Sequence, residues 1–300
     1  MFKNIGIKER KVYYEFLDKN KFFSCEYSFS TLYMWRKANL LQYAIIDNAF
    51  IIKKYDLDYG MFFMEPIGSI SDKELVKLVG CLEVVRRKEN MSWLFGNVTK
   101  SFINRLQLIY GDKLTIEEEK NHYDYIYESD KLINLKGKEY ANKRNKINRF
   151  CKEYEYSIKV IEKNINGSGL LKYRDFLGRW NKEHINKDCY FEYEVESIED
   201  LLKNIEELNI KLIELYSGKE LIGFSIGEIF NDNVYIVHVE KCLRDFNGAY
   251  AFINNMALKL CCNGQKFINR EEDLGISGLR KAKISYRPLF LEKKYLIKIE

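Results

Sequence analysis

The sequence predicts an α/β fold of two similar domains in tandem, each a mixed, twisted sheet flanked by helices. The chain has 300 residues, 46% of them hydrophobic, which suits two cores better than one. A strand pair, a long strand, a helix, a strand, a helix and a closing strand follow one another in this order near both ends of the chain. The chain has only two prolines and no low-complexity linker, so the repeated order of strands and helices alone sets the domain boundary. We assign residues 1–129 to the first domain and residues 130–300 to the second.

The elements of the first domain follow from alternation and capping. Asp47 and Asn48 separate two strand-like runs and predict a hairpin turn. Ser71 is a good N-cap, and the apolar residues after it fall at helical spacing. We expect a third strand before this helix, then a strand, a second helix and a closing strand, at residues 59–68, 92–98, 101–110 and 122–129.

The second domain repeats this order after a middle segment that is mainly helical. The middle segment is expected to hold helices at residues 136–154, 170–184 and 198–208. The repeated strands are expected at residues 210–229 (a pair), 234–243, 266–272 and 289–299, and the helices at residues 248–261 and 277–286.

Composition narrows the functional class. Forty-nine Lys and Arg against 44 Asp and Glu leave a net charge of only +5, so affinity for nucleic acid or membranes must come from a local patch. Seven cysteines without a paired motif indicate reduced thiols, and the three histidines are dispersed, so we expect no metal site. The charged start and the absence of a long apolar run favour a soluble, cytoplasmic protein with no transmembrane segment.

One candidate ligand site is the turn between the strand at 234–243 and the following helix. A helix N-terminus leaves backbone N–H groups unpaired and attracts anions, and a glycine lets a phosphate approach closely. Gly248 is placed for this, with Arg244 four residues before it. From these residues alone, an ordinary structural corner is the better interpretation.

A second candidate lies at residues 267–290, where a strand ends in Asn269 and a charged run. Active-site residues of open α/β sheets collect at such strand ends. The following helix carries Arg280 and Lys283 on one face, and Tyr286 closes the segment. A solvated, charge-balanced loop remains the alternative.

These residues carry a resemblance. The order strand, Arg-x-x-x-Gly-Ala, helix, strand, Asn, helix, Tyr resembles the GNAT N-acyltransferase fold. The block from Asn269 to Pro288, with residues 124–151 and 24–35, is similar to the C-terminal catalytic domain of phosphatidylglycerol lysyltransferases, the DUF2156 family. Fem-type aminoacyltransferases are relatives of the same design.

The resemblance implies a tandem GNAT-like acyltransferase with aminoacyl-tRNA or acyl-CoA as donor co-substrate, no tightly bound cofactor, and a lipid or small amine or hydroxyl acceptor. It implies a catalytic set of Glu240, Asp273, Arg280, Lys283 and Tyr286. It also implies a donor-binding set of Arg244, Asn247, Gly248, Ala249, Tyr250 and Asn269. Unlike the lysyltransferases, this sequence has no membrane-embedded region, which leaves the acceptor and the donor open.

Two subsidiary expectations concern the first domain and the basic middle helix. Gly68 lacks a preceding arginine and is followed by Asp72 and Glu74, so we expect the first domain to be a degenerate copy that binds no donor. The basic cluster is a candidate contact for tRNA or an anionic lipid surface, or else a solvated face; its members are Lys143, Arg144, Lys146 and Arg149.

Two alternatives to the leading function stay open. One is an acetyl-CoA-dependent N-acetyltransferase. The other is a non-catalytic protein that binds tRNA or a phosphorylated ligand, because fold alone does not settle activity.

Overall fold

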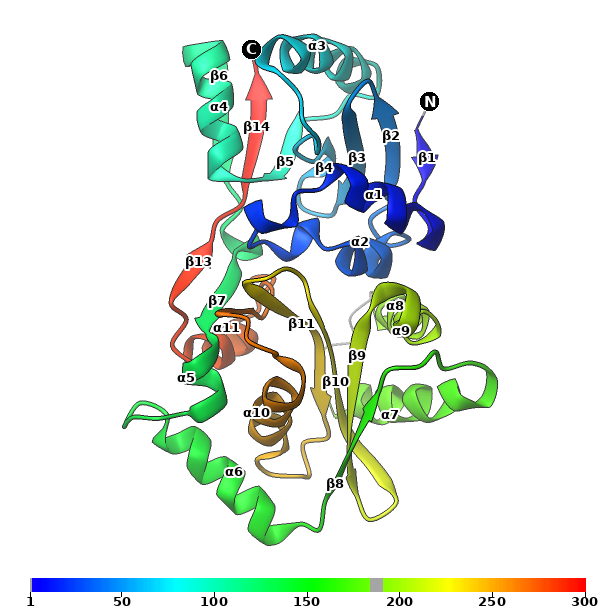
Figure 1. Ribbon diagram of the computed structural model, residues 1–300, viewed down its shortest axis with the longest axis vertical. Coiled ribbons are helices and arrows are strands. Elements are labelled where there is room, and N and C mark those ends of the chain that lie inside the picture. The colour runs from blue at the N-terminus through cyan, green and yellow to red at the C-terminus, as the bar shows by residue number, and fades with distance from the viewer. Residues whose placement is uncertain (1, 184–190) are drawn as a thin grey trace.

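Two seven-stranded sheets lie one above the other along the long axis of the molecule (Figure 1). The computed structural model describes residues 2–183 and 191–300. Helices α1 (Arg10–Phe16) and α2 (Phe29–Trp35) lie between the sheets. A single hydrophobic core includes Phe50 from the first sheet and Phe224 from the second, so the two halves pack through a continuous apolar interior.

The first sheet has antiparallel strands at one edge and a parallel pair at its centre. Its order is β1 (Lys3–Asn4), β2 (Gln42–Ile46), β3 (Ala49–Asp56), β4 (Gly60–Phe63), β5 (Phe95–Val98), β14 (Tyr295–Ile299) and β6 (Leu114–Glu118). Helices α3 (Asp72–Lys88) and α4 (Lys100–Tyr110) pack on it. The predicted hairpin at Asp47 is confirmed, and Ser71 caps α3 through a reciprocal pair of hydrogen bonds with Glu74.

The second sheet has the same plan. Its order is β13 (Phe290–Glu292), β7 (Asp124–Glu128), β12 (Phe267–Asn269), β11 (Val234–Cys242), β10 (Glu220–Ile229), β9 (Ile210–Ser217) and β8 (Ser157–Ile161). Its helices are α5 (Ser129–Asn134), α6 (Ala141–Glu153), α7 (Leu171–Lys182), α8 (Phe191–Lys203), α9 (Ile205–Leu208), α10 (Ala249–Cys261) and α11 (Ser277–Ile284).

The middle segment differs in two details from the prediction. Strand β8 was not expected, and the helix expected at 198–208 is two helices, α8 and α9, separated at Asn204. The helix expected at 170–184 is α7, and its predicted end at His184 lies outside the described residues.

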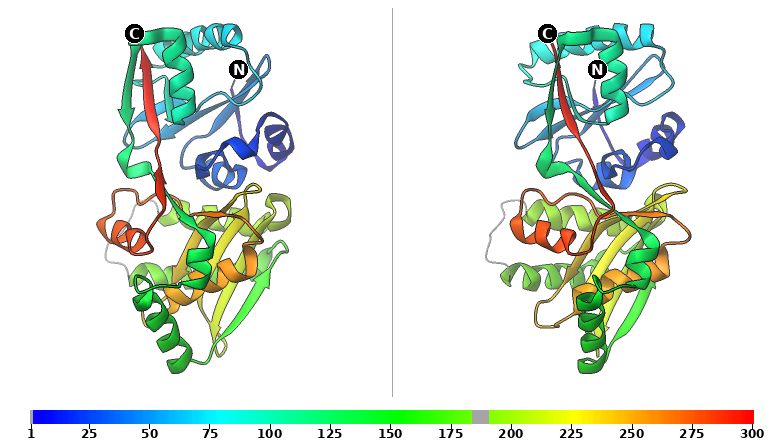
Figure 2. Two further views of the ribbon diagram at one scale, coloured as in Figure 1. Left: turned by 60° about the vertical axis from the view of Figure 1, so that its left-hand side comes forward. Right: turned by 90° about the vertical axis from the view of Figure 1, so that its left-hand side faces the viewer.

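The repeated order of elements is confirmed, but the closing strands are exchanged. In each sheet four antiparallel strands are followed by a parallel partner and two further antiparallel strands. Strand β7, expected to close the first sheet, pairs with β12 and β13 in the second. The run at 289–299, expected as one strand, divides into β13 in the second sheet and β14 in the first (Figure 2). Strand alternation shows which face of a strand is apolar, not which sheet receives it.

The parallel pair of the second sheet separates after a short contact. Residues Val234–Ile236 of β11 pair with Phe267–Asn269 of β12, and β11 then continues to Cys242 without β12 beside it. The two central strands of the second sheet therefore part after Ile236 and Asn269. The side chains of Glu240 and Arg270 meet where the strands part.

Candidate active site

The centre of the candidate site is an ion pair between Glu240 on β11 and Arg270 at the end of β12. Nη2 of Arg270 donates to Oε1 of Glu240 at 3.0 Å, and Asn254 of α10 donates to Oε2 at 2.8 Å. Nη1 of Arg270 is buried and has no hydrogen-bond partner among the described residues. A buried, unpaired guanidinium N–H is costly unless something accepts from it. The arrangement therefore fixes one donor of Arg270 and leaves another available for an anionic or carbonyl oxygen.

Aromatic rings line this guanidinium. Its central carbon lies 4.7 Å from the centre of the Tyr286 ring and 5.9 Å from that of Tyr127. Burial raises the pKa of the Tyr286 hydroxyl above its ordinary value, so this group stays protonated at neutral pH. The hydroxyl of Tyr286 can therefore donate a proton, and its ring forms an apolar wall of the site.

Two lysines complete a cationic cluster around Tyr286. Lys283 of α11 is buried and donates to the backbone carbonyls of Arg270 and Glu271. Lys143 of α6 lies over the Tyr286 ring, with Nζ 3.6 Å from the ring centre, and donates a hydrogen bond to the hydroxyl of Ser285. Burial, followed by repulsion from Arg270, lowers the pKa of each lysine to about 8. Glu240 is the carboxylate that interacts with Arg270 and Lys143. The carboxylates that interact with Lys283 are Glu271, Glu272 and Asp124. Arg270 and Lys143 thus share one carboxylate, and this excess of positive charge favours an anion beside them.

The predicted catalytic pair Asp273 and Arg280 is brought together, but its groups are occupied. Arg280 donates to both carboxylate oxygens at 2.7 and 2.9 Å, Tyr125 donates at 2.5 Å, and the backbone N–H of Gly275 at 2.8 Å. Although burial opposes it, the hydrogen bonds from Arg280 and Tyr125 lower the pKa of Asp273. This geometry favours a clamp that shapes the loop between β12 and α11 over a general base.

Asn269, predicted to bind the donor, is fully buried in hydrogen bonds to protein. Its amide donates to Asp124 at 2.8 Å and to the carbonyl of Phe23 at 2.7 Å, and its carbonyl accepts from the N–H of Glu271 at 2.6 Å. The side chain thus joins the first domain to the loop after β12. A direct contact to a donor stays a prediction.

The turn from Arg244 to Tyr250 is covered by neighbouring segments. Gly248 has a φ of +95°, and a Cβ at this position would lie 2.3 Å from the backbone carbonyl oxygen of Lys146 on α6. The glycine is therefore required by its backbone conformation and by the close approach of α6. Arg244 donates to the carbonyl of Glu183 at 2.9 Å.

The remaining residues of this turn also have protein partners. The N–H of Asn247 is 3.4 Å from the hydroxyl of Tyr154, Ala249 is buried, and the hydroxyl of Tyr250 accepts from Trp180 at 2.8 Å. The contacts support the structural interpretation of the turn, and a phosphate cradle there stays a prediction.

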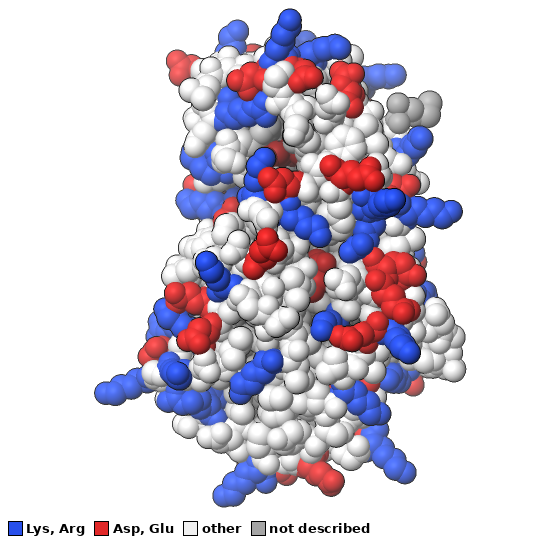
Figure 3. Space-filling view, viewed as in Figure 1, with Lys and Arg blue, Asp and Glu red and all other residues white. Residues whose placement is uncertain are grey.

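The basic helix α6 divides its cations between three environments. Lys143 reaches the site, while Arg144 donates to the carbonyls of Leu135 and Gly137 and so holds the preceding loop. Lys146 and Arg149 are exposed, and Arg149 pairs with Glu153 one turn later. Figure 3 shows Lys and Arg side chains gathered at the lower left, over α6 and the loop before it. Only the exposed part of this helix can contact a large anionic partner.

Two groups of the site, Arg270 and His238, were not among the residues predicted from the sequence. The imidazole of His238 is fully buried between Glu228, 3.1 Å from Nε2, and Glu271, 2.9 Å from Nδ1. Burial opposes its charge, but hydrogen bonds to both carboxylates raise its pKa to about 9, so it is an imidazolium at neutral pH. The sequence did hold a signal for Arg270: it directly follows the strand that ends at Asn269, and it lies in the block from Asn269 to Pro288 that resembles the family.

The first domain contributes to this network. Ser28 and Ser30, at the N-terminus of α2, donate to the carboxylate of Glu228. A second buried group, Cys25, Glu26 and Glu272, has ligand atoms close enough to hold a metal ion, but the ammonium of Lys294 hydrogen-bonds to all three. A cation is thus already supplied by the chain, and the residues do not fit a metal site.

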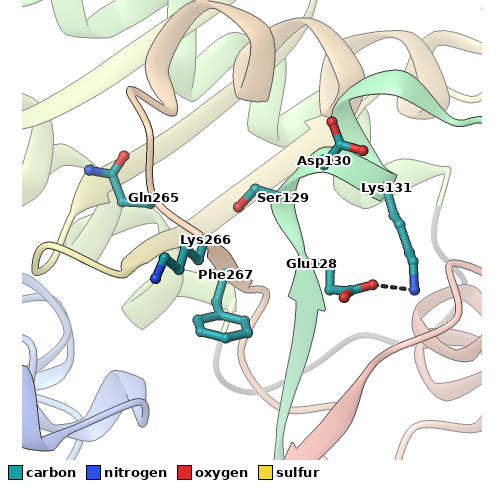
Figure 4. A pocket seen from close by; sticks show the side chains of 7 residues that line it. All are labelled: Glu128, Ser129, Asp130, Lys131, Gln265, Lys266 and Phe267. Carbon is teal, nitrogen blue, oxygen red and sulfur yellow. Dashed lines mark ion pairs between the residues drawn. The ribbon is translucent and has the colours of Figure 1, made fainter.

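A surface pocket of about 420 Å³ lies at the opposite end of β12. Glu128, Ser129, Asp130, Lys131, Gln265, Lys266 and Phe267 line it, and Glu128 pairs with Lys131 across it (Figure 4). It does not include the cluster around Arg270.

Comparisons with known proteins agree on the fold. A protein from Bacteroides thetaiotaomicron VPI-5482, described as a conserved protein of unknown function, is 30% identical, with a TM-score of 0.88 over 100% of this chain and 99% of that one. L-PGS from Bacillus licheniformis is 15% identical, with a TM-score of 0.63 over 89% of this chain and 87% of that one. A tandem GNAT protein from the clavulanic acid biosynthesis pathway is 6% identical, with a TM-score of 0.50 over 99% and 97%. At the last two identities the likeness shows the fold alone.

The family model described as phosphatidylglycerol lysyltransferase, C-terminal, matches residues 19–298. Nearly the whole chain is thus covered, including the Arg270 cluster and both sheets apart from β1 and Ile299. The chain belongs to the phosphatidylglycerol lysyltransferase C-terminal (DUF2156) family and has its tandem GNAT-like fold.

Proposed function

We propose that this protein transfers an aminoacyl group from aminoacyl-tRNA to an amine or hydroxyl acceptor, with the reaction centred on Arg270. The family and the fold support an acyltransferase-type function. The observation that carries the finer assignment is the buried Nη1 of Arg270, which has no hydrogen-bond partner among the described residues and has Lys143 and Lys283 nearby. Acyl transfer develops negative charge on the carbonyl oxygen, and a fixed donor in a dry site stabilises that charge strongly.

The proposed step exchanges one acyl bond for another. The acceptor oxygen or nitrogen forms a bond to the ester carbonyl carbon, and the ester bond to the terminal ribose of the tRNA breaks. The acceptor loses a proton and the ribose hydroxyl gains one. Arg270 would stabilise the oxyanion, and Tyr286, which stays protonated, is the proposed acid for the leaving oxygen.

Two observations favour aminoacyl-tRNA over acyl-CoA as donor. Helix α6 covers the Cβ side of Gly248, where a phosphate of the donor was expected, and so limits the room for a compact CoA pyrophosphate. The same helix exposes Lys146 and Arg149, which suit the phosphate backbone of an RNA. In the first domain, the start of α3 is capped internally by Ser71 and Glu74, which supports the proposal that this copy binds no donor.

The test is a transfer assay with two labelled donors. Purified protein is incubated with a mixed aminoacyl-tRNA pool or with acetyl-CoA, and label is followed into a lipid extract and into small amines. We expect label from aminoacyl-tRNA only, and a roughly 10²- to 10³-fold lower rate for Arg270→Gln. Arg149→Gln is the matched control: it removes an exposed charge of α6 that suits tRNA and leaves the Arg270 cluster unchanged. Label from acetyl-CoA alone would select the N-acetyltransferase, and tRNA binding without transfer would select the non-catalytic protein.

A further inference from the structure

An acid-free, apolar segment follows the candidate site. Residues 274–291 contain four cationic residues and no Asp or Glu. Seven large apolar side chains in this segment are between 36% and 56% exposed: Leu274, Ile276, Leu279, Ile284, Leu289, Phe290 and Leu291. Isolated exposed leucines are ordinary, but a concentration of this kind marks an interaction surface.

The segment forms one side of the molecule. Helix α11 and strand β13 lie side by side on the face turned toward the viewer in the right-hand view of Figure 2. Strand β13 is the edge of the second sheet and pairs only with β7. In Figure 3 the surface over β13 carries few charged side chains. Lys283 points inward to the loop carbonyls, and Arg280, whose side chain is 41% exposed, pairs with Asp273.

The charge of this surface is positive. Lys281 and Arg287 are exposed and form no ion pair with a described residue. The next carboxyl along the chain, Glu292, has its pKa raised to about 7 by burial and by Asp124, so its negative charge is reduced near neutral pH. Apolar side chains next to cations that have no ion-pair partner among the described residues suit the interface of an anionic bilayer.

We propose that the surface of α11 and β13, residues 274–291, docks reversibly on an anionic lipid bilayer. No helix in the described part of the chain has the length and apolarity to cross a membrane, and this surface would bind at the headgroup level. The inner side of α11 carries Lys283, and Tyr286 follows it, so docking would bring headgroups beside the Arg270 cluster. This last consequence rests on the proposed function, whereas the docking does not.

The test is flotation with vesicles in the absence of any acyl donor. Vesicles of phosphatidylcholine, with or without one third phosphatidylglycerol, are mixed with the wild-type protein and with the double variant Ile284→Glu, Leu291→Glu. We expect binding to the anionic vesicles, weakened by high salt and by about tenfold or more in the double variant. The control Val84→Glu, Leu108→Glu changes two exposed apolar residues of α3 and α4, 67% and 89% exposed, and should bind like the wild type.

A second variant separates charge from apolar contact. Lys281→Gln, Arg287→Gln should abolish the preference for anionic vesicles. Equal binding by the double Glu variant and its control, or no flotation at low salt, would overturn the proposal. A dimer that the same Glu variant dissociates would assign the surface to a second copy of the chain instead. Because no donor is present, each result is independent of the transfer assay.

Discussion

The ammonium of Lys294 lies 2.8 Å from the carboxylate of Asp124, at the point where the two exchanged strands cross between the sheets. Lys294 connects β13 to β14, and Asp124 begins β7. Both side chains are almost fully buried, and Lys294 also contacts Glu26 and Glu272. The last segment of the chain is thus attached to the middle of the sequence and to the first domain through one cation.

Replacing Lys294 should therefore destabilise the whole protein. Lys294→Met leaves buried carboxylates without their counter-ion, and breaking a buried pair in this way costs about 3–5 kcal/mol. Urea denaturation followed by circular dichroism measures the loss. Lys298→Met, at an exposed position on β14, should change the free energy of unfolding by less than about 0.5 kcal/mol. Equal effects of both variants would contradict the assignment.

Stability should fall as pH rises through the pKa of His238. The folded-state pKa is raised to about 9, above the ordinary value of 6.5, so the contribution is full below pH 6.5 and is lost as pH approaches and passes 9. The change is on the order of 2–3 kcal/mol. Unfolding free energies measured between pH 6 and 10 test this, with His238→Gln as the variant that removes the dependence. A His238→Gln profile as steep as the wild type would place the titration elsewhere.

Gly248→Ala should destabilise the protein more than the same substitution at a glycine with open space around it. The added Cβ would meet the carbonyl of Lys146 at 2.3 Å, and the φ of +95° is strained for alanine, so we expect a loss of about 3 kcal/mol or more. The control Gly264→Ala has a similar φ of +91° but open space around the new Cβ, and should lose only about 1 kcal/mol. Equal losses, measured by urea denaturation, would show that α6 does not press on Gly248.

Anion binding at the Arg270 cluster should weaken above pH 8. The pKa of Lys143 and that of Lys283 are both about 8, so each lysine loses its charge as pH rises from 7 to 9. The increase in melting temperature produced by inorganic phosphate should shrink over this range. Lys143→Gln should reduce the increase at pH 7, whereas Lys146→Gln, exposed on the same helix, should not. A phosphate effect independent of pH would contradict a role for these lysines.

The candidate site shows which of the predicted residues the fold brings together, while their catalytic roles stay predictions. Glu240, Lys283 and Tyr286 were predicted from strand ends, helical spacing and the family pattern, and the fold does gather them around one guanidinium. That guanidinium, Arg270, was read only as part of a charged run. Spacing predicts that Arg270 follows the end of a strand. It does not predict that Glu240 accepts a hydrogen bond from one guanidinium nitrogen, or that another nitrogen has no partner among the described residues.

Local signals determined the elements of this protein, and the tertiary structure decided how they are joined. Alternation, the Ser71 cap and helical spacing act over a few residues, so the sequence by itself determined the hairpins, most helices and the repeated order of the two halves. The exchange of β7 and β14 depends on backbone hydrogen bonds and the Lys294 cluster between residues about 170 apart, and no short-range pattern encodes it. Likewise, only the tertiary structure shows that α6 approaches Gly248 and requires a glycine there, and a donor phosphate at this turn stays a prediction.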